Sequence, residues 1–305
     1  MDAIQKQLLE AVAGFHEIPT GAYNIRANGQ TAARQTSANI DIITKEDGTG
    51  IEIHIKAGTK KESVHIPVIL SQAGLTETVY NDFYIGDNAD VTIIAGCGIH
   101  NGGSAASQHN GIHRFFIGKN ARIKYVEKHY GSGDGSGERI MNPKTEIEIA
   151  EGGYMEMDTV QIKGVDSTIR ETEAKLAEGA KIMVTERLMT HGHQTAESRF
   201  KVCMNGKDSS ANIISRSVAK EESRQVFYSD LEGNAPCSGH TECDAIIVGN
   251  AKISSLPQVT ATDDSGIDRS RGRRADHQWI LKINFNSRSI EEIDYRNKDK
   301  NEYIF

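Results

Sequence analysis

The chain has 305 residues, of which 25% are charged and 37% are hydrophobic, and its formal net charge is −7. This is the composition of an acidic protein with a large core, and nothing in its overall charge points to nucleic acid as a partner. No apolar run approaches the ~18 residues that a membrane-spanning helix needs, and the N-terminus lacks the basic and apolar regions of a secretory signal. We therefore expect a cytoplasmic protein without a membrane span.

Residues 1–20 predict a short amphipathic helix. Its apolar side chains fall on one helical face, and Gly14 is a suitable stop. They are Ile4, Leu8, Leu9 and Val12. From about Gly21 the apolar period changes to two, as in Gly50–Ala57, which reads GIEIHIKA. Strict alternation of this kind is typical of half-buried β-strands.

A glycine-centred corner followed by an alternating apolar strand then recurs along the chain. The corner glycines lie mostly about 27 to 34 residues apart and are Gly86, Gly118, Gly152, Gly179, Gly206 and Gly249. A unit of this length cannot bury its own apolar face, but stacked units form a continuous core. The pattern predicts an all-β protein, a right-handed parallel β-helix over residues 21–268. An antiparallel sandwich also gives regular strands and turns, and stays open as an alternative.

The four cysteines are separated in the sequence, and none forms a Cys-x-x-Cys motif. They are Cys97, Cys203, Cys237 and Cys243. This usage predicts free thiols rather than disulfides or a structural zinc site. The stretch GHTECDAIIVGNAKISSLP, from Gly239, places Cys243 just before an apolar strand at Ala245–Val248. A thiol there would be fixed in space and near solvent, although a small buried hydrophobic side chain is an equally good interpretation.

Three motifs give the chain a resemblance to a known family. They are GCGIHNGGSAASQHNGIHRFFIGKNARIKYVEKHYG from Gly96, SANIISRSVAKEESRQVFYSDLEG from Ser210, and GHTECDAIIVG followed by ISSLPQV. Over roughly Ile66 to Asp268 the chain resembles the SufB/SufD family, the β-helical core components of the Suf machinery that assembles iron–sulfur clusters. It is most similar to the compact members that lack most of the long N-terminal region.

The resemblance implies a set of site residues. The family cysteine that accepts sulfur and holds the nascent cluster corresponds to Cys243, which would also be the iron ligand. Chemistry agrees, because thiolates hold iron–sulfur clusters and a persulfide forms from a thiolate. A second family cysteine corresponds to Cys97, and a family histidine to His109, although a histidine in a Gly/Ser/Asn-rich loop is more often a solvated turn residue. We expect Cys203 and Cys237 to be structural.

The resemblance also implies cofactors and partners. The cluster would be transient, and ATP would enter only through a SufC-like ABC-type ATPase. The partners would be that ATPase, a second copy or a SufB/SufD paralogue as dimer partner, a sulfur donor, and apo-proteins that accept the cluster. The chain itself carries no Gly-x-x-x-x-Gly-Lys-Ser/Thr phosphate loop.

Residues 269–305 depart from the family pattern. Members carry a His-Glu pair after the proline-containing strand and then a helical segment that binds the ATPase. Here the sequence reads RSRGRRADHQWILKINFNSRSIEEIDYRNKDKNEYIF, and His277-Gln278 is the nearest substitute for the pair. Because the resemblance stops at one point, we interpret this segment as a divergent tail, with a reading-frame disruption as the favoured hypothesis.

The sequence therefore predicts a non-enzymatic assembly scaffold. One alternative is a β-helix enzyme that acts on polysaccharide, but only 6% of the residues are aromatic. A purely structural β-solenoid is the other alternative. His191 and His193, two apart in the sequence, could chelate a metal, but no third ligand is evident and a solvated loop is the better interpretation.

Overall fold

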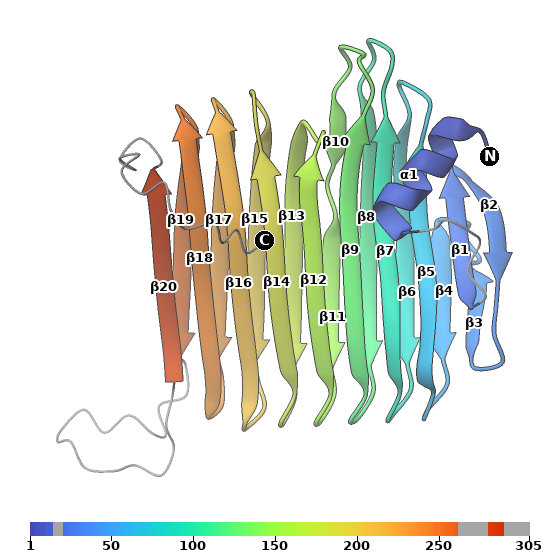
Figure 1. Ribbon diagram of the computed structural model, residues 1–305. Coiled ribbons are helices and arrows are strands. Elements are labelled where there is room, and N and C mark those ends of the chain that lie inside the picture. Colours follow the sequence, from blue (N-terminus) through green and yellow to red (C-terminus); the bar gives the residue numbers. More distant parts are fainter. Residues whose placement is uncertain (15–20, 262–279, 290–305) are drawn as a thin grey trace, which may run out of the picture.

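Strands alternate between two facing parallel sheets along almost the whole molecule. The computed structural model describes residues 1–14 and 21–261, together with the backbone of residues 280–289. Each chain segment crosses one sheet, turns a corner and returns in the other sheet, so successive coils stack into a solenoid (Figure 1). The predicted β-helix is confirmed, and the antiparallel sandwich is wrong.

The first sheet contains, in spatial order, β2 (Gln30–Gln35), β1 (Ala22–Ala27), β5 (Lys60–Leu70), β7 (Asp90–His100), β9 (Arg122–Ser132), β12 (Tyr154–Lys163), β14 (Lys181–Thr190), β16 (Ser209–Glu221), β18 (Cys237–Gly249) and β20 (Ile280–Ser289). The second contains β19 (Lys252–Ala261), β17 (Arg224–Gly233), β15 (Thr195–Met204), β13 (Ser167–Leu176), β10 (Arg139–Met141), β8 (Ser107–Ile117), β6 (Thr76–Ile85), β4 (Gly50–Ile55) and β3 (Ile40–Thr44), with β11 (Lys144–Ile149) between β8 and β13.

The corners explain the recurring glycines. Gly152 and Gly179 adopt positive φ angles of 66° and 64°, a conformation that side chains with a Cβ rarely adopt. At Gly86 the φ angle is ordinary, but a Cβ would lie 2.4 Å from the backbone nitrogen of Ala57 in the preceding coil. The corner glycines therefore serve either the bend itself or the close stacking of one coil on the next.

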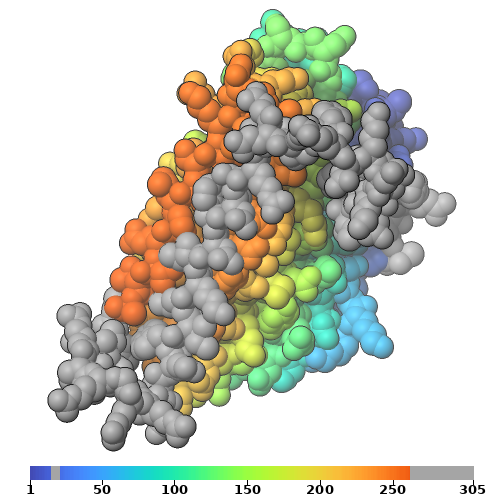
Figure 2. Space-filling model, turned by 60° about the vertical axis from the view of Figure 1, so that its left-hand side comes forward, coloured from blue at the N-terminus to red at the C-terminus, as the bar shows by residue number. Residues whose placement is uncertain are grey.

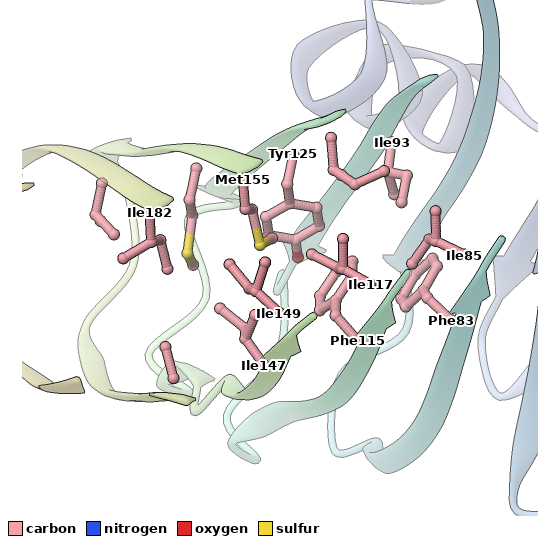
Figure 3. Close-up of a cluster of buried hydrophobic side chains, with 14 of the residues drawn as sticks. Phe83, Ile85, Ile93, Phe115, Ile117, Tyr125, Ile147, Ile149, Met155 and Ile182 are labelled. Carbon is pink, nitrogen blue, oxygen red and sulfur yellow. The ribbon is translucent and has the colours of Figure 1, made fainter. Parts of the chain in front are cut away.

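The interior between the sheets holds the hydrophobic core. Inward-facing side chains stack from coil to coil, as in the parallel rings of Phe83 and Phe115, whose centroids are 4.4 Å apart (Figure 3). Tyr125 packs edge-on against Phe115 at 5.0 Å between centroids. Strands of this kind have one buried face and one exposed face, which is the alternation that the sequence displays.

The N-terminal end of the solenoid is capped. The pairs β1–β2 and β3–β4 are antiparallel, unlike the parallel pairs that follow them. Helix α1 (Ala3–Ala13) lies on the outer face of the first sheet, against β5, β7 and β9, and buries Leu8, Leu9 and Val12 (Figure 1). The outermost strands at this end, β2 and β3, have six and five residues, and short edge strands are a device that suppresses pairing with other chains.

The C-terminal end is built differently. Strand β19 is the last described strand of the second sheet, and its inward side chains are only half-buried, whereas those of β17 are buried. Figure 2 shows these last coils, in orange, along one edge of the molecule. Most of the predicted tail 269–305 lies outside the described residues, but its segment β20 pairs in parallel with β18 and so extends the first sheet.

No helix among the described residues is long and apolar enough to cross a membrane.

Candidate functional site

Cys243 lies in the middle of β18 and points into the solenoid. Its side chain is 1% exposed and belongs to the interior core, beside Ser215 of β16 in the parallel register. The expectation of a thiol near solvent at the mouth of a strand is therefore wrong. The polar run GHTECD is itself strand, because its alternate residues Gly239, Thr241 and Cys243 are small enough to face inward.

The surroundings of Cys243 oppose its ionisation. Burial raises the pKa of the thiol to about 11, and the carboxylates of Glu186 and Asp244 act in the same direction. The Ser255 side chain and the charge of Arg216 act in the opposite direction. In this closed state Cys243 is a thiol at neutral pH, whereas sulfur and iron chemistry requires the thiolate.

A row of polar side chains runs along the inside of the first sheet and ends at Cys243. Five strands contribute one residue each, and every one is at most 3% exposed: Glu127, Thr159, Glu186, Ser215 and Cys243. We call these five residues the interior polar row. Buried polar groups cost free energy unless they are hydrogen-bonded or paired, so a solenoid that needed only stability would place apolar side chains here.

Side chains of the facing sheet hold the two carboxylates of this row. The guanidinium of Arg170, on β13, donates a hydrogen bond to Glu127 Oε2, and its Nε lies 3.8 Å from Glu186 Oε1. Glu186 accepts hydrogen bonds from Ser198 Oγ at 2.5 Å and from Ser215 Oγ at 2.8 Å. The row is therefore held from both sheets.

The Glu127 end of the row continues into a buried histidine network. Tyr125 Oη lies 2.7 Å from His113 Nδ1 and donates to Glu127 Oε1 at 3.1 Å. His129 Nε2 lies 3.6 Å from Glu127 Oε1. Burial by itself raises the pKa of Glu127, but Arg170, His129 and His113 together outweigh it and hold that pKa well below its usual range. Glu127 therefore stays ionised inside the protein.

Cys97 and His109 lie at this same end, both buried. Cys97 on β7 is 5% exposed and pairs in register with His129 of β9. Burial raises the pKa of its thiol well above the ordinary value, with Glu127 and Glu77 adding to the effect. His109 lies on strand β8 rather than in a solvated loop, 3% exposed, with Nδ1 3.8 Å from Glu77 Oε2. The expectation of a solvated loop at His109 is therefore wrong. The small and polar residues around it form a strand, in which Ser107, His109 and Gly111 point inward.

Cys97 and His109, two of the three predicted site residues, thus lie in the polar region around Glu127. The interior polar row connects this region to Cys243. No motif in the sequence marks Glu127, Arg170 or Glu186 as site residues. The only indication in the sequence is that charged residues occupy one of the two alternating faces of these strands. That indication can be used only when it is known which face is buried.

The glycines of the GCGIH motif have a structural explanation. A Cβ at Gly96 would lie 2.6 Å from the carbonyl oxygen of Val12, and one at Gly98 would lie 3.2 Å from the Leu8 side chain. Both glycines therefore face outward and admit α1, while Cys97 between them faces inward.

The remaining candidates stay apart from this region. All four cysteines are free, as predicted; Cys203 is half-buried with its Sγ 3.7 Å from Glu232 Oε2, and Cys237 is buried in the core. His193 is exposed and lies 3.4 Å from Glu222. Across the residues that the structure describes, no three His, Cys, Asp or Glu side chains are grouped closely enough to hold a metal ion.

Comparison with known proteins agrees with these features. The family model described as SUF system FeS cluster assembly, SufBD core domain, matches residues 71–266. The chain is 30% identical over 224 residues to an iron–sulfur cluster assembly SufBD family protein of Methanocaldococcus jannaschii, covering 72% of this chain and 70% of that protein. A protein of the same description from Archaeoglobus fulgidus is 27% identical over 221 residues, covering 71% of this chain and 57% of its own length. A third, from Pyrococcus horikoshii, is 22% identical over 257 residues, or 84% of this chain and 72% of the relative. The matched region holds most of the solenoid, the interior polar row and Cys243, and this chain therefore belongs to the SufBD family of iron–sulfur cluster assembly proteins.

Proposed function

We propose that this protein is a non-enzymatic scaffold of Suf-type iron–sulfur cluster assembly that receives sulfur and iron at Cys243. In this proposal the cluster is held transiently and passes to apo-proteins, and a SufC-like ABC-type ATPase supplies the energy of the cycle. The dimer partner is a second copy or a SufB/SufD paralogue.

The observation that carries the proposal is the interior polar row ending at a buried thiol. Burying Glu127, Glu186 and Arg170 is unfavourable compared with apolar packing, since each charge must be stripped of water. Function is the usual reason for such a departure from an apolar core. Because the row ends at Cys243, the thiol is the natural centre of that function.

The chemistry requires that the site open. At Cys243 the thiolate would attack the outer sulfur of a donor persulfide, the donor S–S bond would break, and the donor would leave as a thiolate that takes up the proton lost by Cys243. Neither donor nor iron can reach a side chain that is 1% exposed. A conformational change driven by the ATPase would supply access, and it would also relieve the burial that raises the pKa of the thiol.

The C-terminal end of the solenoid favours dimerisation there. Within the described residues β19 has a neighbour, β17, on one side only, and Leu256 on its outer face is 56% exposed. An unpaired strand edge is a natural site for pairing with another chain. Cys243 lies on β18, the preceding strand in the facing sheet, and would then lie close to the dimer interface.

The test is anaerobic co-expression with the ATPase, followed by iron and sulfide analysis and visible spectroscopy of the purified protein. We expect iron and sulfide in the wild type and their loss in Cys243→Ser, with Cys237→Ser on the same strand as the matched control. Equal iron and sulfide in wild type and Cys243→Ser would contradict the proposal.

The same experiment separates the alternatives. A purely structural solenoid predicts no dependence on any thiol, and a polysaccharide-active enzyme predicts sugar binding in place of iron. The buried position of the charged residues, inside the solenoid rather than along an outer groove, favours the scaffold over both.

A further inference from the structure

A stripe of apolar side chains crosses the outer face of the first sheet near its C-terminal end. The neighbouring strands β12, β14, β16 and β18 contribute one outward side chain each: Ile162, Met189, Val218 and Ile246. We call these four residues the outer apolar stripe. Ile162 and Ile246 are 48% and 41% exposed, and the stripe lines a groove of about 440 Å³. A contiguous apolar surface with a polar rim marks an interaction site.

Helix α1 shows that this face of the sheet accepts a helix. It lies over β5, β7 and β9 of the same sheet, above Gly96 and Gly98 of β7 (Figure 1). The row of outward residues that begins at Gly96 continues strand by strand to Arg187 of β14. Met189 lies two residues beyond Arg187, as Gly98 lies two residues beyond Gly96. The outer apolar stripe is therefore level with α1 and lies further along the same face.

On one side of the outer apolar stripe, arginines are balanced by carboxylates. Arg187 pairs with Asp158 at 2.6 Å. Arg216 pairs with Glu242 at 2.7 Å and also with Asp244. This side therefore has no excess of positive charge.

On the other side, two exposed lysines border the outer apolar stripe. Lys163 directly follows Ile162, and Lys220 is the next outward residue of β16. The adjacent carboxylate of Glu221 is turned to the backbone of Gly192, whose N–H donates to Oε2. Positive charge on one flank of an apolar groove attracts a partner with carboxylates at the matching flank and fixes its orientation.

The size of the groove fits one helix. Four strands about 4.8 Å apart give the outer apolar stripe a length of about 14 Å, which corresponds to about two and a half helical turns. Ten described residues line the groove, whereas each side of a stable dimer contributes about 20–30 residues. The groove is thus too small to hold two copies of this chain together, but it is large enough for a short amphipathic helix.

We infer that this groove binds an amphipathic helix of a partner protein. The apolar side chains of that helix pack on the outer apolar stripe, and its carboxylates face Lys163 and Lys220. Binding of this kind uses apolar residues three and four positions apart on the helix. The inference does not depend on the proposed function, because the groove lies on the outer face of the sheet and Cys243 points into the interior.

The test is fluorescence anisotropy of a labelled peptide titrated with the full-length protein. The peptide is rich in alanine and has about 18 residues, a length that is helical in water. It carries leucines on one face and glutamates along one flank of that face. Two control peptides replace the glutamates by lysines or scramble the leucine positions. Because the chain has a net charge of −7, nonspecific attraction favours the lysine peptide, so a preference for glutamate reports the lysine flank of the groove.

We expect saturable binding of the glutamate peptide, and binding of both control peptides about tenfold weaker or more. Ile162→Asp and Ile246→Asp should each weaken binding by a similar factor, because a charge would then meet the apolar face. The double variant Lys163→Glu, Lys220→Glu should reverse the preference between the glutamate and lysine peptides. Met183→Asp, on the same face of β14 but outside the groove, is the matched control and should bind as wild type does. Melting temperatures verify that each variant folds.

A photo-reactive amino acid at Met189 identifies the occupant of the groove. Cross-links to the glutamate peptide support the inference. Cross-links to a second copy, or to other parts of the same chain in place of the peptide, would show a different occupant and overturn it. No binding by the wild type, equal binding of the glutamate and lysine peptides, or unchanged binding in both aspartate variants of the stripe would also overturn it. None of these results bears on iron or sulfur at Cys243, so the scaffold function is tested separately.

Discussion

At the scale of single residues, the interior is divided between apolar and polar neighbours, and Tyr125 joins the two. Its ring packs against Phe115 in the hydrophobic core (Figure 3). Its hydroxyl contacts His113 and Glu127. Tyrosine suits this boundary because it combines a large apolar ring with one polar atom. The polar side of that boundary is where the ionisable groups have altered pKa values, and two predictions follow from them.

The first concerns the reactivity of Cys243. Because burial raises the pKa of its thiol from an ordinary 9.0 to about 11, the thiolate fraction at pH 8 falls about a hundredfold. Iodoacetamide should therefore alkylate Cys243 at least about 100 times more slowly in the folded protein than in urea. Peptide mass spectrometry of timed samples measures both rates, and half-buried Cys203 serves as the internal comparison. Equal rates for Cys243 in the folded and unfolded states would contradict the closed site.

The second concerns acid stability. Burial lowers the pKa of His109 from 6.5 to about 3, with the neighbouring histidines His113 and His129 adding to the effect. Between these two pH values the unfolded chain binds a proton at this residue and the folded chain does not, so stability falls as the pH falls below about 6.5. At pH 5 the loss from this residue is about 2 kcal/mol. Urea unfolding at pH 7 and pH 5 should show it, and His109→Gln should flatten the dependence; an unchanged pH dependence in His109→Gln would refute the assignment.

At the scale of elements, the contact between α1 and β7 accounts for the position of the helix and for the two glycines of the strand. The helix ends at Gly14, which adopts a positive φ, and its capping box involves Asp2 and Gln5. It lies on β7 because two glycines leave room for it, and the backbone of β7 is thereby fixed from outside while Cys97 is presented inside.

The third prediction tests this contact. Gly96→Ala would place a Cβ 2.8 Å from the Cβ of Val12 and 2.6 Å from its carbonyl oxygen. We expect a loss of about 1–3 kcal/mol in the free energy of unfolding, the usual cost of overpacking. The matched control is Gly102→Ala, where the nearest atom would be 3.7 Å away.

Removal of α1 provides the reciprocal test. In a chain that starts after Gly14, Gly96→Ala should cost almost nothing. If the substitution destabilises the shortened chain as much as the full one, its effect does not arise from α1.

At the scale of the whole molecule, the two ends of the solenoid differ. Short antiparallel strands of six and five residues form the N-terminal end, whereas β19 has ten residues and is only half-buried on its inward side. A parallel solenoid can in principle grow at either end, but short edge strands suppress pairing, so the longer β19 is the better site for a partner.

The fourth prediction follows from this asymmetry. Leu256→Lys places a charge on the outer face of β19, a common means of blocking strand pairing. We expect it to weaken the dimer about tenfold or more, which corresponds to about 1.4 kcal/mol. Light scattering across a concentration series measures this. Met183→Lys, at a site 37% exposed on β14, is the control and should leave the dimer intact; equal weakening by both substitutions would place the interface elsewhere.

The sequence by itself determined the architecture and the family. Period-two alternation indicates strands, and the glycine corners repeat at a spacing that only a stack of coils can satisfy, because one coil cannot bury its apolar face. The corner at Gly152 and the helix that stops at Gly14 were predictable for the same local reason, since backbone conformation there depends on residues within a few positions. The motif around Cys243 placed the chain in its family without any knowledge of contacts.

The tertiary structure alone decided what surrounds the thiol. Glu127, Glu186 and Cys243 lie about 60 residues apart along the chain and become neighbours only through strand register, which depends on the length of every intervening corner. Both faces of these strands carry polar residues, so alternation could not tell which face was inside. Cys243 and His109 were consequently expected near solvent, and the buried charges of the interior polar row passed unnoticed. Burial is a property of the stacked coils, and no single coil contains that information.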